Sequence, residues 1–220
     1  MRLFITATGT GVGKTYVTAA LIAAARGRGL RARAVKPVLS GFSPDDPTSD
    51  AHLLLAAQGL PPAMIDTVSP WRYAAPLSPD MAAAREGNAV PVDAVIAFTQ
   101  ATLRGPEDVV LVEGVGGAFV PLDQHRTVAH WIAAVPARPV VVAGSYLGTL
   151  SHTIATVRAM AAAGISPLAV VISESLEGPP LGETMASLSP HLPGLPILPL
   201  PRGGAGQALL NALRAAATSA

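Results

Sequence analysis

Two lysines, two carboxylates and one threonine stand where they could handle a polyphosphate and a metal ion. Lys14 and Thr15 end the run 8–15, which reads TGTGVGKT and lies between an apolar stretch and an alanine-rich stretch of helical type. A strand, a glycine-rich turn, Gly-Lys-Thr and a helix together form a P-loop. In such a loop the backbone N–H groups and the start of the helix attract phosphate. Lys14 then supplies a point charge, and the Thr15 hydroxyl is placed to bind magnesium.

The other three charged residues have a functional and a structural interpretation each. Glu113 ends the apolar run 108–113, where an acid can hold magnesium beside a P-loop or simply cap a turn. Lys36, between Val35 and Pro37, can stabilise a transferred γ-phosphoryl group or be an ordinary solvated lysine. Asp50 begins a helical stretch, and a carboxylate favoured by the helix dipole is its default interpretation.

The elements that must position these residues alternate between strand and helix. The predicted strands are 2–5, 31–38, 108–113, 139–143, 168–172 and 195–200. The predicted helices are 16–28, 50–58, 79–85, 92–103, 127–135, 151–163 and 207–217, with 59–79 irregular and rich in proline. This alternation predicts an α/β fold of the P-loop NTPase type. We expect a mostly parallel sheet with helices on both faces, in a single domain over residues 1–220. Ligands bind such sheets outside the carboxyl ends of the strands, where the charged residues above are expected.

Composition narrows the functional classes. The 220 residues carry a formal net charge of +1, which gives no electrostatic case for a nucleic-acid partner. No cysteine is present, so thiolate metal sites and disulfides are excluded. No apolar run approaches the roughly 20 residues that span a bilayer, so we expect a cytoplasmic protein without a membrane partner.

Four sequence blocks in this order resemble the dethiobiotin synthetase family. After the P-loop come VKPVLSG at 35–41, VEGVGG at 112–117 with Pro121-Leu122, and LGTLSHT at 147–153. Ser49-Asp50-Ala51 matches a further short motif, and the resemblance extends from residue 2 to about 177. The P-loop alone is generic, whereas the second and third blocks together are much more specific.

The resemblance implies an ATP-dependent cyclo-ligase of biotin biosynthesis. Such an enzyme joins 7,8-diaminopelargonate and CO2, using ATP and Mg2+, to give dethiobiotin, ADP and phosphate. A carbamate on one amine would be activated by the γ-phosphoryl group as a mixed anhydride, and the second amine would then displace phosphate. This chemistry depends on positioning and charge stabilisation rather than on a protein nucleophile.

The resemblance also implies a role for individual residues of this chain. The catalytic residues would be Lys36, Lys14 and Thr10, and the magnesium ligands Thr15, Asp50 and Glu113. The nucleotide would contact Gly9, Thr10, Gly11, Val12, Gly13, Lys14, Thr15, Glu113, Ser173, Leu200 and Pro201. The diamine would contact Thr10, Lys36, Ser40, Gly117, Gly148, Thr149, Leu150 and Ser151. The residues 148–151 would come from the partner chain of a homodimer, where Ser151 would cap a helix start that binds the substrate carboxylate.

Two alternative functions were weighed against this one. Nucleotide-switch ATPases of the partition and division-site type share the loop and the sheet, but they carry a signature lysine where Gly9 stands here. An amidotransferase-linked synthetase would need a cysteine nucleophile, which this chain lacks. One departure from the family pattern bears on base selection, because Ser173 stands where the family often has asparagine.

Overall fold

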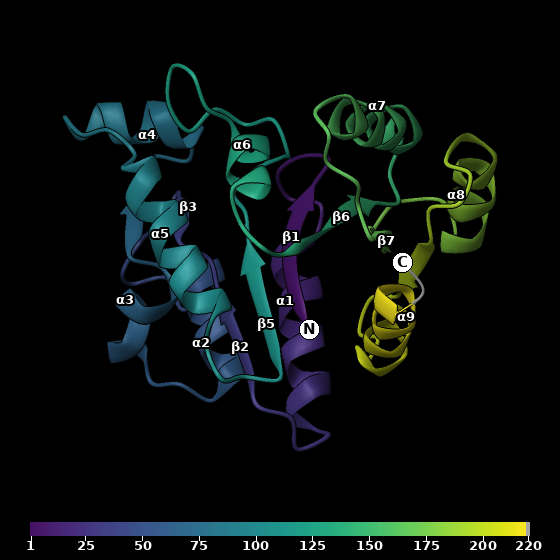
Figure 1. Cartoon of the computed structure of the whole chain (residues 1–220), viewed down its shortest axis with the longest axis horizontal. Coiled ribbons are helices and arrows are strands. Elements are labelled where there is room, and N and C mark those ends of the chain that lie inside the picture. Colours follow the sequence, from purple (N-terminus) through teal and green to yellow (C-terminus); the bar gives the residue numbers. More distant parts are fainter. Residues whose placement is uncertain (219–220) are drawn as a thin grey trace.

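The computed structural model describes residues 1–218, and a six-stranded sheet runs through its centre (Figure 1). Across the sheet the order is β2-β5-β1-β6-β7-β8, and every neighbouring pair is parallel. In chain order these strands are β1 (Arg2–Ala7), β2 (Ala32–Val35), β5 (Val109–Glu113), β6 (Arg138–Gly144), β7 (Ala169–Ser173) and β8 (Ile197–Leu200). Strand β1 lies between β5 and β6 in the interior of the sheet. The P-loop follows the carboxyl end of β1 and therefore lies between the carboxyl ends of β5 and β6.

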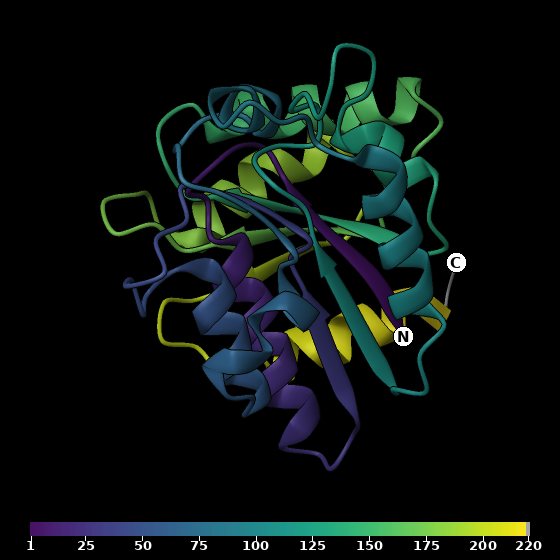
Figure 2. The ribbon, with the colours of Figure 1, turned by 90° about the vertical axis from the view of Figure 1, so that its left-hand side faces the viewer.

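Helices cover both faces of this sheet, as predicted (Figure 2). Buried residues of α1 (Lys14–Arg26), α2 (Asp50–Gln58) and α9 (Gln207–Thr218) pack with one face of the strands. The opposite face packs against α4 (Pro79–Arg85), α5 (Val92–Leu103), α6 (Val128–Ala133), α7 (Thr149–Ala162) and α8 (Leu181–Leu188). Alternate residues of β1 divide between the two cores, which is the two-residue period of a strand that is buried on both sides.

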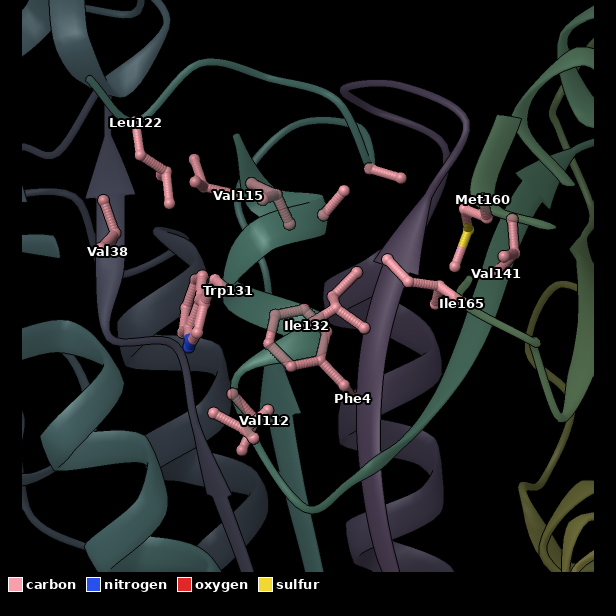
Figure 3. Close-up of a cluster of buried hydrophobic side chains, with 14 of the residues drawn as sticks. Phe4, Val38, Val112, Val115, Leu122, Trp131, Ile132, Val141, Met160 and Ile165 are labelled. Atoms are coloured by element: carbon pink, nitrogen blue, oxygen red, sulfur yellow. The ribbon is translucent and has the colours of Figure 1, made fainter. Parts of the chain in front are cut away.

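Aromatic packing anchors the second of these cores. The rings of Phe4 in β1 and Trp131 in α6 meet edge to face with centroids 4.9 Å apart, and both side chains are fully buried (Figure 3). The Trp131 indole N–H donates to the Thr99 hydroxyl of α5 at 3.0 Å. Gly114 lies so close to Phe4 that an added Cβ would be 2.9 Å from the ring. This packing holds the segment after β5 against the central strand.

The predicted strand 31–38 is wrong in its second half. Strand β2 ends at Val35, and the Lys36 N–H instead donates to the Val68 carbonyl at 2.9 Å. Pro37 has no N–H to continue the ladder. The chain then forms a separate strand, β3 (Val38–Ser40), which pairs in parallel with β4 (Trp71–Tyr73). The break leaves Lys36 directly after the end of strand β2. This is the predicted position, at the carboxyl end of a sheet strand.

Three further differences separate the structure from the prediction. The segment 59–79 is not irregular, because it contains η1 (Pro62–Met64), α3 (Ile65–Val68) and β4. Helix α8 and the short η2 (Ser189–His191) were not predicted. Helix α7 begins at Thr149 and its N-cap is Gly148, with φ of 96°, so Ser151 lies inside the first turn and is not the cap. No helix within residues 1–218 is long and apolar enough to cross a bilayer.

Candidate active site

The P-loop forms an anion cradle at the end of β1. Gly11 and Gly13 have φ of 72° and 99°, a left-handed backbone that only glycine adopts readily. The first backbone hydrogen bond of α1 runs from Val17 N to Gly13 O at 2.9 Å. Within residues 1–218 the amides of Gly11, Gly13 and Lys14 donate to no acceptor, as expected for a loop that receives phosphate. The Lys14 Nζ donates to the Gly9 carbonyl at 3.0 Å and so folds back over the loop.

Lys36 lies between the two predicted metal-binding carboxylates. Its Nζ is 2.8 Å from Glu113 Oε1 and also forms an ion pair with Asp50 Oδ2. The Thr15 hydroxyl donates to the same Glu113 oxygen at 2.7 Å. Glu113 is completely buried and Lys36 nearly so. Sheet order explains why Lys36, Glu113 and Thr15 lie together. The strands that precede or contain them, β2, β5 and β1, are neighbours and have their carboxyl ends on the same side of the sheet.

Charge and burial set the protonation of the two lysines in opposite directions. Burial, together with the neighbouring Lys36 cation, lowers the pKa of Lys14 to about 8. Burial also acts to lower the pKa of Lys36, but the Glu113 and Asp50 carboxylates outweigh it and raise that pKa above its usual value. Burial acts to raise the pKa of Asp50, and Lys36 reverses the effect and lowers it. Lys36 is therefore a fixed cation, and Asp50 is ionised.

The oxygen donors of this cluster fit a magnesium ion. Thr15, Asp50 and Glu113 offer one hydroxyl and two carboxylates, the hard ligands that Mg2+ prefers. Glu113 Oε2 is buried without a hydrogen-bond partner, which leaves one acceptor unused beside the P-loop. No three His, Cys, Asp or Glu side chains of residues 1–218 form a metal-binding group. The ion would thus also need the Thr15 hydroxyl and the phosphates of its nucleotide, as is usual for Mg2+.

All three predicted catalytic residues and three of the eight predicted diamine contacts line one cavity of about 720 Å3. The predicted residues in its wall are Thr10, Gly11, Gly13, Lys14, Thr15, Lys36, Ser40 and Asp50. Ser40 has a buried hydroxyl without a partner, so its oxygen is available to a ligand. Sequence patterns did not predict the other residues of the wall. These are Tyr16, Leu39, Pro76, Leu77, Ser78, Pro79, Val115, Gly116 and Val120. The segment 76–79 lies next to Ser40 through contacts of the β3–β4 sheet, which no local pattern indicated.

Other predicted residues lie outside this cavity. Gly9 and Val12 belong to the loop itself, and Gly117 packs against the backbone of residues 7–9. Residues 148–151 do not line the P-loop cavity of their own chain. Gly148, Thr149 and Leu150 line a separate cavity of about 480 Å3 with Tyr146, Leu147 and Glu177, and Ser151 lines neither of the two. The side chain of Leu200 is buried in the hydrophobic core, and Pro201 contributes its carbonyl to a hydrogen bond from Tyr16.

Ser173 lies in a third, smaller cavity beside the P-loop. That cavity measures about 180 Å3 and is lined by Gly11, Val12, Gly13, Tyr16, Ser173, Glu174 and Arg202. Ser173 packs directly on the loop, since a Cβ added to Gly13 would lie 2.4 Å from its hydroxyl oxygen. The structure thus brings Ser173 next to the nucleotide-binding loop and adds Glu174 and Arg202, which sequence reasoning missed.

Comparisons with known proteins identify the family of this chain. A model of the AAA domain family matches residues 1–199. The ATP-dependent dethiobiotin synthetase BioD of Acidiphilium cryptum is 48% identical over 200 residues, covering 89% of this chain and 90% of its own. The enzyme of the same name from Methylobacterium nodulans is 41% identical, over 92% and 93% of the two chains. The chain belongs to the ATP-dependent dethiobiotin synthetase family. The prediction of an ATP-dependent ligase with a P-loop is confirmed.

Solved structures are similar in fold alone. The MinD cell division ATPase of Pyrococcus furiosus matches 99% of this chain and 98% of its own, with a TM-score of 0.53 at 17% identity. The MinC:MinD complex of Aquifex aeolicus gives a TM-score of 0.56 at 11% identity, over 97% and 93% of the chains. These matches confirm the P-loop NTPase-type architecture. At such identities they carry no argument for the switch function.

Proposed function

We propose that this ligase closes a cyclic urea on 7,8-diaminopelargonate with CO2 and ATP, giving dethiobiotin, ADP and phosphate in biotin biosynthesis. The observation that carries the proposal is the pairing of two cations, Lys14 and Lys36, with the oxygen donors Thr15 and Asp50 in one cavity, and the ion pair of Lys36 with the buried Glu113. No cysteine is present, so no thiol nucleophile is available. A reaction driven by phosphoryl activation needs cations of this kind and no protein nucleophile.

In the proposed sequence, one substrate amine adds to CO2 and loses a proton to form a carbamate. A carbamate oxygen attacks the γ-phosphorus, and the bond to the β–γ bridging oxygen breaks as ADP leaves. The second amine attacks the carbamoyl carbon, phosphate departs, and a second proton is lost as the ring closes. Each step joins a nucleophile of the substrate to an electrophilic carbon or phosphorus atom. The barrier therefore depends mainly on how the two groups approach and are oriented.

The chain's own residues would act on this sequence by binding and by charge. The P-loop amides and Lys14 would hold the β- and γ-phosphates. Lys36 would lie between carbamate and γ-phosphoryl group and offset their repulsion. Thr10 and Ser40 would contact the diamine. Magnesium held by Thr15, Asp50 and Glu113 would neutralise charge on the β- and γ-oxygens.

The direct test is a reaction containing 7,8-diaminopelargonate, bicarbonate, MgCl2 and ATP. Mass spectrometry should detect dethiobiotin, with ADP and phosphate formed in equal amounts. Omitting the diamine should leave ATP hydrolysis at background. Steady ATP hydrolysis without diamine, and no dethiobiotin with it, would instead favour the nucleotide-switch alternative.

A homodimer with a shared active site is part of this proposal. Leu147 is 99% exposed and lines one cavity with Leu150, which is 37% exposed, so the rim at the start of α7 is apolar in part. The amides of Leu150 and Ser151 precede the first α7 hydrogen bond, from His152 to Gly148. The Thr149 N–H donates to the Tyr146 carbonyl at 3.0 Å, so within residues 148–151 the N–H groups of Leu150 and Ser151 would be presented to the distal carboxylate of a substrate bound to the partner chain.

Leu147→Glu is expected to weaken this dimer, because it places a charge in the apolar rim. Light scattering should show monomer at concentrations where the wild type is dimeric. The KM for the diamine should rise about tenfold or more while ADP affinity stays unchanged. Met64→Glu, at an exposed methionine on α3's flank, is the matched control and should change neither quantity. A monomeric wild type that is fully active at assay concentration would refute the shared site.

Base selection is expected to be relaxed. Ser173 has one hydroxyl where an asparagine would offer a paired donor and acceptor, so it makes fewer directed contacts to a base edge. Fewer contacts leave about 0.5–1.5 kcal/mol less discrimination per missing hydrogen bond. The kcat/KM values for ATP, CTP and GTP should thus lie within about tenfold of one another. A large preference for ATP that no Ser173 substitution removes would contradict this expectation.

A further inference from the structure

A glycine-rich segment contributes one residue, Arg202, to the wall of the smaller cavity beside the P-loop. Residues 201–206 read PRGGAG and connect β8 to α9. Arg202 of this segment lines the 180 Å3 cavity together with the P-loop glycines and Tyr16. A nucleotide whose phosphates lie in the P-loop would extend its sugar and base toward such a neighbouring space. Glycines lose more conformational freedom than other residues when fixed, so something must hold this wall in place.

Helix α1 holds the segment through one row of residues spaced four apart. Tyr16, Ala20 and Ala24 follow the i, i+4 spacing that places side chains on one helix face, and Arg28 lies in the turn just after the helix ends at Arg26. A Cβ added to Gly206 would lie 2.3 Å from the Ala20 carbonyl oxygen, so the two backbones touch. Gln207 donates to the Ala24 carbonyl at 2.9 Å and accepts from Arg28 Nε at 2.6 Å. These contacts fix the far end of the segment.

The near end is held by hydrogen bonds to Tyr16 and to Glu174, and by one inside the segment from the Gly204 N–H to the Pro201 carbonyl at 2.9 Å. The Tyr16 hydroxyl donates to the Pro201 carbonyl at 2.9 Å and lies 3.4 Å from the Gly204 carbonyl. From the opposite side, the Arg202 N–H donates to Glu174 at 2.9 Å. Tyr16 directly follows Thr15, the proposed magnesium ligand, and lines both the phosphate cavity and the smaller one. One side chain therefore joins the phosphate cradle to the wall next to it.

We propose that Tyr16 is a positioning residue for the nucleoside part of the nucleotide. It acts through the segment 201–204, which its hydroxyl holds at a fixed distance from the P-loop. The inference rests on nucleotide binding at that loop and adds a residue that the phosphate-binding motif does not include. Its consequence is selective, because the phosphate cradle itself needs no contact from the Tyr16 hydroxyl. Loss of the hydroxyl should weaken ligands that carry a nucleoside and spare those that consist of phosphates alone.

Tyr16→Phe tests this, because it removes one oxygen and keeps the ring. Calorimetry with Mg2+ would measure the Kd of ADP and the Kd of inorganic tripolyphosphate for wild type and variant. We expect a 3- to 10-fold weaker ADP affinity, about the value of one hydrogen bond, and an unchanged tripolyphosphate affinity. The KM for ATP should rise by the same factor, with kcat within twofold of wild type. Thermal unfolding of each variant would show that both fold.

Arg28→Ala is the matched control, because it loosens the same segment at the end far from the cavity. Its ADP affinity should stay within twofold of wild type. The proposal fails if Tyr16→Phe binds ADP as wild type does, if it weakens tripolyphosphate equally, or if Arg28→Ala has the same effect. A wild-type protein that binds tripolyphosphate but not ADP would also overturn it. A wild type that binds neither would refute nucleotide use at the P-loop, and with it the proposed function.

Discussion

Lys36→Ala should lose dethiobiotin formation by about 10²- to 10³-fold, roughly 3–4 kcal/mol of transition-state stabilisation. The carbamate that attacks phosphorus is an anion and must approach an already negative γ-phosphoryl group. Lys36 is the cation held at the end of β2, and its ion pairs with Glu113 and Asp50 keep it charged at neutral pH. Nucleotide affinity should fall far less, because the P-loop and Lys14 remain.

The same substitution also has a structural consequence that needs a control. Without Lys36, Glu113 is a fully buried carboxylate that keeps only the Thr15 hydroxyl as a donor. Removing one partner of a buried pair typically costs about 3–5 kcal/mol of folding stability. We therefore expect a lower Tm for Lys36→Ala, restored in part by Mg-ADP. Lys36→Met keeps the volume of the stem and should show the same loss of product, which separates charge from packing.

Lys36→Arg should rescue the rate only in part, because a planar guanidinium is bulkier and directs its donors differently from an ammonium. Product formation and ADP affinity would be measured for all three variants at saturating ATP and diamine. Unchanged product formation in Lys36→Ala would remove the chemical role proposed here. It would favour the switch-type ATPase, whose cycle of nucleotide, magnesium and positioned water needs no such lysine.

Lys14→Ala should reduce turnover by at least about 10³-fold, because the γ-phosphoryl charge then loses its direct cation. The fold should remain intact. Burial and the Lys36 cation lower the pKa of Lys14 to about 8, which means that the folded protein disfavours the charged form. A neutral side chain at this position therefore removes an unfavourable buried charge and not a stabilising one, and the Tm should be equal or higher.

Lys14→Met serves as the volume-matched variant and should behave like Lys14→Ala in turnover. Mg-ADP should no longer raise the Tm of either variant as much as it raises that of wild type. Arg33→Ala, which removes a cation from exposed β2 surface, is a control for net charge and should leave both turnover and the Tm shift unchanged. Wild-type turnover in Lys14→Ala would rule out the P-loop as the phosphate site.

Local patterns in the sequence determined the parts of this protein that form from neighbouring residues. The strand, turn and helix of residues 2–26 follow from an apolar run, glycines at positive φ and an alanine-rich stretch. The predicted helices at 50–58 and 92–103 match the structure at both ends. The repeated alternation of strand and helix was enough to predict a parallel sheet with helices on both faces, because parallel strands require such crossovers.

Tertiary structure alone decided which distant residues meet. The sequence placed Lys36, Asp50 and Glu113 at element ends, but their ion pairs depend on β2 lying beside β5, a strand more than 70 residues away. The pairing of residues 38–40 with 71–73 and the bond from Tyr16 to Pro201, across a separation of 185 residues, have no local signature. Such contacts form because sheet order and core packing bring distant segments together. The hydrophobic periodicity of a sequence indicates only on which face of its own helix or strand a residue lies.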